Sequence, residues 1–148
     1  MRAVLQRVES ASVTVSGMTA GEIGRGLLVY LGITTDDGPE DLRYIAGKIL
    51  NTRMFDDENG VPNRSVLEIG GAVLLVSQFT LYGDARHGRR PGYTAAARPE
   101  IAKPLYEEMI AALSREIPVA TGVFQAHMQV RSVNDGPFTI LLESRRAF

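Results

Sequence analysis

The sequence has 148 residues, of which 45% are hydrophobic and 22% are charged, and its net charge is −1. These values are typical of a globular protein and exclude both a disordered chain and a strongly basic nucleic-acid-binding domain. The chain has no cysteine, which excludes a disulfide scaffold, a thiolate zinc site and a cysteine nucleophile. We expect a single domain over residues 1–148.

The apolar runs of the sequence are short. None approaches the roughly 20 residues that a membrane-spanning helix needs. Gln6 and Arg7 interrupt the apolar start of the chain, which does not fit the core of a signal peptide. We therefore expect a protein of the cytoplasm with no membrane partner.

The first third of the chain is rich in strand patterns. Apolar and polar residues alternate over residues 3–8 and 12–15, and a further short strand is expected to end at Ile23. The continuous apolar run at 27–31 predicts a strand that is buried on both faces.

A helix is expected after this run. Asp37 is the predicted N-cap, and Glu40 lies three residues later, as in a capping box. Pro39 is tolerable in a first helical turn. The apolar stripe of this helix consists of Leu42, Ile45, Ala46, Ile49 and Leu50.

The middle of the chain contains the strongest strand signal. Short strands are expected at 53–55 and 65–67, on either side of a turn at 57–60. The apolar run at 72–76 predicts a buried strand that leads directly into residues 77–82.

The last part of the chain begins with a glycine- and arginine-rich loop at 83–93. A second helix is expected at 99–117, with an apolar stripe of Ile101, Leu105, Met109, Ile110 and Leu113. Alternation at 127–133, a turn at 134–137 and a strand at 138–142 follow. Many strands with two helices, not in strict alternation, indicate a mixed α/β domain with layered sheets.

The familiar catalytic constellations are absent from the sequence. His87 and His127 lie far apart, and neither has a partner at metal-ligand spacing, so we expect no metal and no cofactor. His127 falls in an alternating segment, where a surface or interface position is the simpler interpretation than a member of a Ser-His-Asp triad.

Three segments are unusual. Ser77, Gln78, Phe79 and Thr80 follow the strongest strand, where a sheet can present polar groups to a crevice, although they include no general base. Asn134-Asp135-Gly136-Pro137 has the composition of a tight turn. Arg86, Arg89 and Arg90 form a local basic cluster that suits phosphate groups, and a solvated loop is an equally good interpretation.

Together these segments resemble the D-aminoacyl-tRNA deacylase family. The resemblance runs over essentially the whole chain. It is most specific in the Ser-Gln-Phe-Thr sequence at 77–80 and the Asn-x-Gly-Pro-x-Thr sequence at 134–139, which occur in the family's order and near its spacing. It also includes 1–8, Gly88-Arg89-Arg90-Pro91 and Met128-Gln129-Val130.

The resemblance implies a three-layer β/β/α fold with mixed, mostly antiparallel sheets and two main helices. It implies a homodimer whose active sites lie at the subunit interface, with Ser77, Gln78, Phe79 and Thr80 of one subunit facing Gly136 and Pro137 of the other, and with Met128 also binding substrate. It further implies that the Gly136–Pro137 peptide is cis and that its two carbonyl oxygens bind the substrate's α-amino group. Arg86, Arg89 and Arg90 are then expected to contact tRNA phosphates.

The implied reaction is hydrolysis of the ester of D-aminoacyl-tRNA. An L-residue would drive its side chain into the wall formed by Gly136 and Pro137, so it is rejected by steric clash. Glycine has no side chain to clash, and some activity on glycyl-tRNA is expected.

Two mechanisms stay open. Thr80 could act as a nucleophile, but the sequence offers no base to activate it. We favour a substrate-assisted reaction, in which the 2′-OH of the terminal adenosine helps to activate water while Gln78, Phe79 and Thr80 position the ester and stabilise the oxyanion. A non-enzymatic RNA-binding module, a general threonine-dependent esterase and a purely structural dimer are the rival interpretations.

Overall fold

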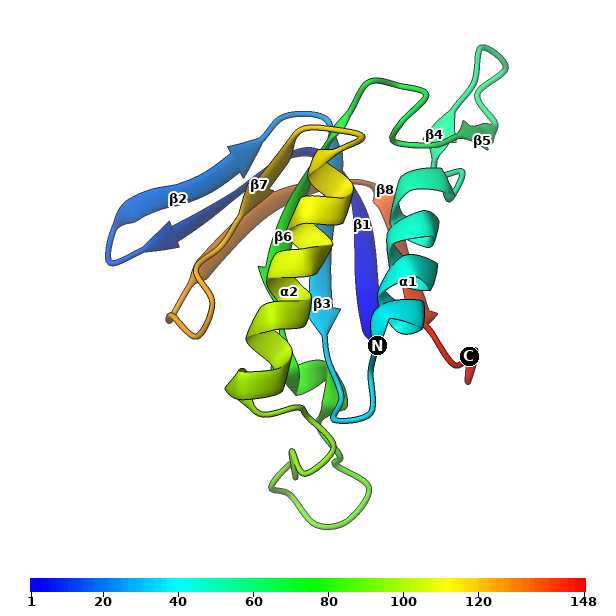
Figure 1. The fold of residues 1–148 in the computed structure, drawn as a ribbon. Coiled ribbons are helices and arrows are strands. Elements are labelled where there is room, and N and C mark those ends of the chain that lie inside the picture. Colours follow the sequence, from blue (N-terminus) through cyan, green and yellow to red (C-terminus); the bar gives the residue numbers. More distant parts are fainter.

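The computed structural model describes residues 1–148 (Figure 1). Its strands are β1 (Arg2–Val15), β2 (Met18–Ile23), β3 (Gly26–Gly32), β4 (Phe55–Asp56), β5 (Pro62–Arg64), β6 (Ala72–Ser77), β7 (Val119–Thr121) and β8 (Gln129–Glu143). Its helices are α1 (Pro39–Asn51), the short 3-10 helix η1 (Phe79–Tyr82) and α2 (Pro99–Ser114). No helix is long and apolar enough to cross a membrane.

Six of the strands form one mixed sheet. Its order is β2-β1-β3-β6-β7, and β8 pairs with β1 outside this path. The pairs β1–β2, β1–β3 and β1–β8 are antiparallel, and β3–β6 and β6–β7 are parallel. The small β4–β5 sheet is also antiparallel. The predicted mixed, mostly antiparallel arrangement is therefore confirmed.

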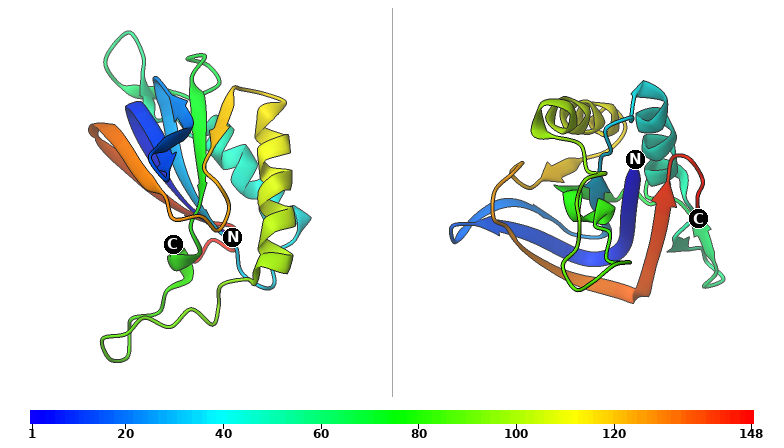
Figure 2. Two further views of the ribbon diagram at one scale, coloured as in Figure 1. Left: turned by 90° about the vertical axis from the view of Figure 1, so that its left-hand side faces the viewer. Right: turned by 90° about the horizontal axis from the view of Figure 1, so that it is seen from below.

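The main sheet curls until its two ends meet. β2 and β7 stand at opposite ends of the strand order, yet a Cβ atom added at Gly21 would come within 2.5 Å of the carbonyl oxygen of Thr121. The sheet is thus barrel-like, and both helices cover the same outer side of it (Figures 1 and 2). This gives the predicted order of a helical layer over two layers of strands.

The central strands are buried on both faces, as their continuous apolar run predicts. In β3, Leu27, Val29 and Leu31 belong to the large core cluster beneath the helices, whereas Leu28 belongs to a second cluster inside the curled sheet. In β6 the same division separates Val73 and Leu75 from Leu74 and Val76. Successive side chains of a strand point to opposite faces, so each strand supplies both cores.

The helices use their apolar faces much as predicted. All five residues of the expected α1 stripe are buried. The buried face of α2 is instead Ala102, Tyr106, Met109 and Leu113, and Ile101 is exposed. Tyr106 also donates a hydrogen bond of 2.9 Å from its hydroxyl to the carbonyl oxygen of Leu75, and the predicted Leu105 and Ile110 are partly buried against the same core. The helix also ends at Ser114, three residues before the predicted end.

The cap of α1 is a correction to the sequence prediction. Gly38 is the N-cap, and its amide donates to Asp41 at 2.9 Å. The predicted cap Asp37 instead accepts a hydrogen bond from the amide of Thr34 at 2.8 Å and pairs with the amino group of Met1 at 2.5 Å. The ammonium group of Met1 and the carboxylate of Asp37 are both buried, and they form an ion pair because a buried charge requires a partner.

Two predicted local structures are also wrong. Residues 65–67 lie in a turn that begins with mutual hydrogen bonds between Ser65 and Glu68. The strand of this region, β5, precedes the turn and ends at Arg64. Residues 134–137 do not form a turn, because they lie inside β8, where irregular register with β1 accommodates them. The two segments predicted as strands at 3–8 and 12–15 are one continuous strand, β1.

Candidate active site

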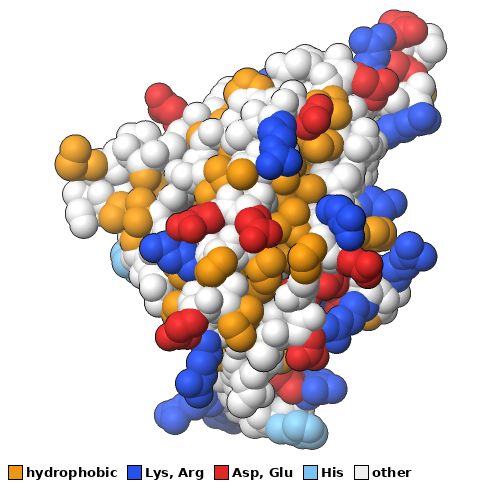
Figure 3. Space-filling model, in the orientation of Figure 1, with side chains coloured by type: hydrophobic (Ala, Val, Ile, Leu, Met, Phe, Trp, Pro, Cys, Tyr) orange, Lys and Arg blue, Asp and Glu red, His pale blue; other side chains and the backbone are white.

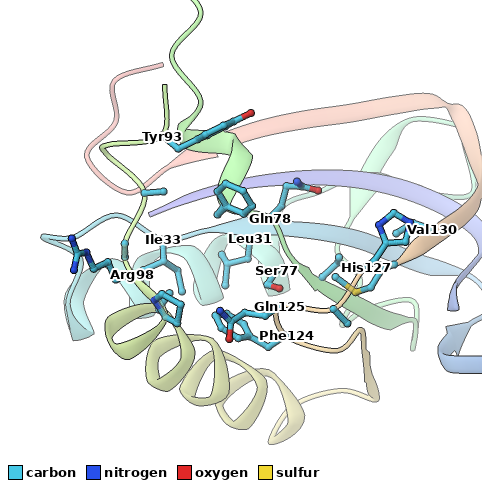
Figure 4. A pocket seen from close by; sticks show the side chains of 18 residues that line it. Leu31, Ile33, Ser77, Gln78, Tyr93, Arg98, Phe124, Gln125, His127 and Val130 are labelled. Atoms are coloured by element: carbon cyan, nitrogen blue, oxygen red, sulfur yellow. The ribbon is translucent and has the colours of Figure 1, made fainter. Parts of the chain in front are cut away.

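A cavity of about 620 Å³ opens at the ends of β3 and β6 (Figure 4). Its walls come from Leu31 and Ile33, from residues 76–79, from the stretch between Tyr93 and Ala102, and from residues 124–130. The volume falls within the range of small-molecule binding sites, and most lining residues are hydrophobic, as is usual for such sites.

The Ser77-Gln78-Phe79 segment is held at this cavity by β3. The amide of Gln78 donates to the carbonyl oxygen of Leu31 at 2.8 Å, which extends the β3–β6 pairing by one residue. Gly32 permits this approach, because a Cβ atom there would lie 2.9 Å from the Cβ of Leu81 and 3.0 Å from the carbonyl oxygen of Gln78. The strand then turns into η1.

η1 presents Phe79 and Thr80 at the mouth of the cavity. Phe79 is 57% exposed and packs edge-on against Tyr93, with 5.1 Å between ring centroids. Thr80 is exposed and does not line the cavity, but its hydroxyl accepts a hydrogen bond from the side-chain amide of Gln78. The two aromatic rings add an apolar surface beside these polar groups.

The opposite wall comes from the segment between β7 and β8. Phe124, Gln125, His127 and Met128 line the cavity, and Phe124 packs against Tyr106 of α2 at 5.7 Å between centroids. In the close view, Gln78 lies on one side and Phe124 and Gln125 on the other, with the Ser77 hydroxyl between them (Figure 4). Met128, the predicted substrate-binding residue, therefore lies on the wall of this cavity.

The structure corrects part of the interpretation of His127 as a surface or interface position in an alternating strand. It is exposed, but it lies before the start of β8 and at the edge of the cavity. Tyr93, Phe124 and Gln125 were not singled out as site residues at all. No local sequence signal marks them, because only the folding of distant segments brings them to the end of β6.

The remaining predicted substrate-binding residues lie elsewhere in this subunit. Gly136 and Pro137 do not line the cavity, and both are exposed. The peptide bond between them is cis, as expected from the resemblance. Within one chain, therefore, the structure brings Ser77, Gln78, Phe79 and Met128 together but leaves Gly136 and Pro137 apart.

Arg7 of β1 holds the segment that carries Gly136. Its guanidinium donates to the carbonyl oxygens of Met54 at 2.8 Å and Asp135 at 3.0 Å, and it pairs with the carboxylates of Asp56 and Asp135, each at 3.2 Å. It also lies 4.8 Å from the ring centroid of Phe138. Sequence reasoning missed this residue, because an arginine in an alternating strand normally points into solvent.

The basic loop is closed at its base, and one of its three predicted arginines has an ion-pair partner within the loop. A two-stranded stem closes the loop through backbone hydrogen bonds between Asp84 and Gly92. Arg86 donates to both carboxylate oxygens of Asp84, at 2.9 and 2.7 Å, and these bonds hold the pKa of Asp84 well below its ordinary value. Arg89 and Arg90 have no ion pair, whereas Arg86 is already engaged. Basic side chains lie at this end of the molecule, with acidic ones beside them (Figure 3).

The residues that line the cavity include no Asp or Glu. The titratable or charged side chains among them are those of Tyr93, Arg98 and His127. Nowhere in residues 1–148 do three His, Asp or Glu side chains gather as a protein metal site would require. The cavity of one chain therefore offers hydroxyls, amides, backbone groups and the imidazole of His127 to a bound molecule.

Comparison with known proteins finds relatives that match the whole length of the chain. A D-aminoacyl-tRNA deacylase of Thermosipho africanus is 58% identical, and one of Clostridioides difficile is 56% identical, each over an alignment 149 positions long that covers both chains completely. A solved structure titled c-Myc DNA Unwinding Element Binding Protein is 41% identical, with a TM-score of 0.92 over 97% of this chain and 98% of that one.

A second solved structure, titled as that of a probable eukaryotic D-amino acid tRNA deacylase, shares the fold with a TM-score of 0.82 at 21% identity, over 96% of this chain and 98% of that one. The family model described as D-Tyr-tRNA(Tyr) deacylase matches residues 4–143. The chain therefore belongs to the D-Tyr-tRNA(Tyr) deacylase family.

Proposed function

We propose that this protein hydrolyses the ester bond of D-aminoacyl-tRNA in the cytoplasm and releases the free D-amino acid and tRNA. The observation that carries the proposal is the position of Ser77, Gln78 and Phe79 in the cavity of a chain that matches the family over its whole length. A cavity of about 620 Å³ has room for an aminoacylated nucleoside.

The complete site requires a second subunit. Gly136 and Pro137 are exposed and lie outside the cavity of their own chain, so they are available to the cavity of another. β8 also exposes Val133 and Leu141, which are 52% and 58% accessible, as an isologous interface would require. In the homodimer, Gly136 and Pro137 of the partner subunit face Ser77 and Phe79.

The preference for D-residues follows from the wall that Gly136 and Pro137 of the partner subunit form, rather than from recognition of the substrate's side chain. A D-residue that binds its α-amino group at the wall directs its side chain away from it, whereas an L-residue collides with it. Glycine escapes the collision, so glycyl-tRNA is also a substrate. Exclusion by clash requires no contact with the D side chain, and many D-amino acids are accepted.

Catalysis is assisted by the substrate. The lining residues supply no carboxylate base, and the hydroxyl of Thr80 is bonded to the amide of Gln78 rather than to a base. The 2′-OH of the terminal adenosine therefore helps to activate water, while Gln78 positions the ester and the backbone amides of Phe79 and Thr80 stabilise the oxyanion. A tRNA that carries its D-residue on the 3′-OH of a terminal 2′-deoxyadenosine should be hydrolysed far more slowly.

Hydrolysis of D-tyrosyl-tRNA and L-tyrosyl-tRNA, compared with and without a chelator, tests the function. We expect rapid loss of the D ester alone, unaffected by the chelator. Equal loss of both esters would indicate a general esterase. Loss of neither would favour a nucleic-acid-binding module without activity.

A further inference from the structure

Gln125 has an unusual backbone for a residue with a side chain. Its φ angle is 65°, in the left-handed region that glycine adopts most readily. Ser16 and Arg146 are the other non-glycine residues with positive φ, and neither lines the cavity. Backbone conformations of this kind are concentrated at ligand sites, so the position of Gln125 on the cavity wall calls for a role of its side chain.

The side-chain amide of Gln125 is free. It makes no hydrogen bond within the chain, whereas the amide of Gln78, across the cavity, is committed to the hydroxyl of Thr80. The neighbouring wall is apolar, with Phe124 and Ala126 on either side of Gln125 in the chain. Gln125 thus offers an unused donor and an unused acceptor at the cavity wall, next in the chain to the aromatic Phe124 (Figure 4).

This combination matches the edge of a purine. A glutamine amide pairs with adenine through two hydrogen bonds, accepting from the 6-amino group and donating to N7. Aromatic side chains add a stacking surface for the base. Phe124 and Gln125, adjacent in the chain, both line this side of the cavity.

We propose that Gln125 recognises the adenine of the tRNA's terminal nucleotide and so determines specificity for that base. The inference rests on the proposed deacylase function, because that function places the terminal adenosine in this cavity. Gln125 touches the base and not the ester, so it sets the affinity for the terminal nucleotide and leaves the chemical step to Ser77, Gln78, Phe79 and Thr80.

The test uses D-tyrosyl-tRNA that ends in adenosine and the same tRNA ending in inosine. Inosine keeps N7 but replaces the 6-amino group by an oxygen, which cannot donate to the glutamine carbonyl. We expect kcat/KM of the wild-type protein to be about tenfold lower on the inosine-ended tRNA, mostly through KM. In Gln125→Gly, the two substrates should react at nearly equal rates.

Two further measurements separate recognition from a structural role. Glycine accepts the left-handed backbone, so Gln125→Gly should unfold at a temperature no lower than the wild type. Gln125→Glu keeps an acceptor for the 6-amino group and should retain part of the preference for adenosine.

Each result decides the matter. Equal loss of activity on both tRNAs in Gln125→Gly, or an unchanged preference for adenosine, would overturn the role of Gln125 while leaving the deacylase function intact. Hydrolysis of neither D-tyrosyl-tRNA by the wild-type protein would overturn the deacylase function, and with it this inference.

Discussion

At the scale of single residues, Arg7 shows how a buried charge is made tolerable. It is only 8% exposed, yet two backbone carbonyl oxygens and two carboxylates surround its guanidinium. The planar fork reaches Met54 and Asp135 at once, which an ammonium group cannot do with the same geometry. Arg7 thereby joins the β4 region to the segment that precedes Gly136.

Replacement of Arg7 by lysine tests this arrangement. Arg7→Lys should lower the free energy of unfolding by about 1–3 kcal/mol, because at least one buried carbonyl group loses its donor. Urea unfolding measures the change, and Arg131→Lys, at an exposed position of β8, is the matched control. Identical unfolding curves for Arg7→Lys and the wild type would contradict the structural role.

Thr80 offers a second test at this scale, because it distinguishes the two mechanisms. If Thr80 only positions the ester, Thr80→Val should lower kcat on D-tyrosyl-tRNA by no more than about a thousandfold, the usual cost of losing one stabilising donor. Thr80→Ser, which keeps the hydroxyl, should remain close to the wild type. A covalent ester trapped on Thr80 would establish it as a nucleophile instead.

At the scale of elements, α1 begins with a hydrogen-bonded cap that also binds the end of the chain. Burial acts to raise the pKa of Asp41, but hydrogen bonds from the Ser144 hydroxyl at 2.5 Å and the Gly38 amide at 2.9 Å outweigh it and hold that pKa below its ordinary value of 3.8. The ionised carboxylate therefore stabilises both the helix and the segment after β8.

The stability of α1's cap should depend on pH. Because the pKa of Asp41 is lower in the folded state than in the unfolded state, its contribution is complete well above pH ~4 and is lost as the pH falls further. Asp41→Asn should be less stable than the wild type near neutral pH, and urea unfolding should show the difference shrinking in acid. A difference that is independent of pH would show that ionisation of Asp41 is unimportant.

The loop at 83–93 is the other element with a separable role. Arg89→Ala and Arg90→Ala should each weaken tRNA binding and reduce the dependence of log Kd on log salt by about one, since each removes one phosphate contact. Hydrolysis of a small D-tyrosyl adenosine ester should remain nearly intact. Arg86→Ala is the comparison, because Arg86 is bound to Asp84 and should affect the salt dependence less.

At the scale of the whole molecule, the residues of the proposed site lie on two separate parts of the chain. The cavity with Ser77 and the exposed Gly136–Pro137 segment lie apart in the same chain. In the proposed twofold dimer, each subunit would give its cavity to one site and its Gly-Pro segment to the other, so that two equivalent sites would be complete.

Mixed dimers test this completion directly. Phe79→Arg and Pro137→Arg change exposed side chains, and each homodimer should be inactive on D-tyrosyl-tRNA. After unfolding and refolding together, half of the dimers should contain one subunit of each kind and one intact site, which restores roughly a quarter of wild-type activity. Light scattering should give twice the 16.1 kDa mass of the chain. A monomeric mass, or no recovery of activity, would contradict the shared site.

Much of the fold follows from local patterns. The apolar runs in β3 and β6, buried on both faces, and the stripe of α1 could be recognised because burial and side-chain periodicity are properties of adjacent residues. Predictions failed where a distant partner intervened. Asp37 pairs with the amino group of Met1 and does not cap α1. Residues 134–137 lie in β8, which pairs with β1, and form part of a strand instead of a turn.

The sequence by itself determined the α/β class, the two helices and, through its motifs, the family and the Ser77-Gln78-Phe79 end of β6. Only the tertiary structure decided that Tyr93, Phe124 and Gln125 share a cavity with that segment, that Arg86 is engaged by Asp84, and that Arg7 is buried. The physical reason is that these contacts join segments far apart in the chain or depend on side-chain geometry, which no pattern of neighbouring residues records.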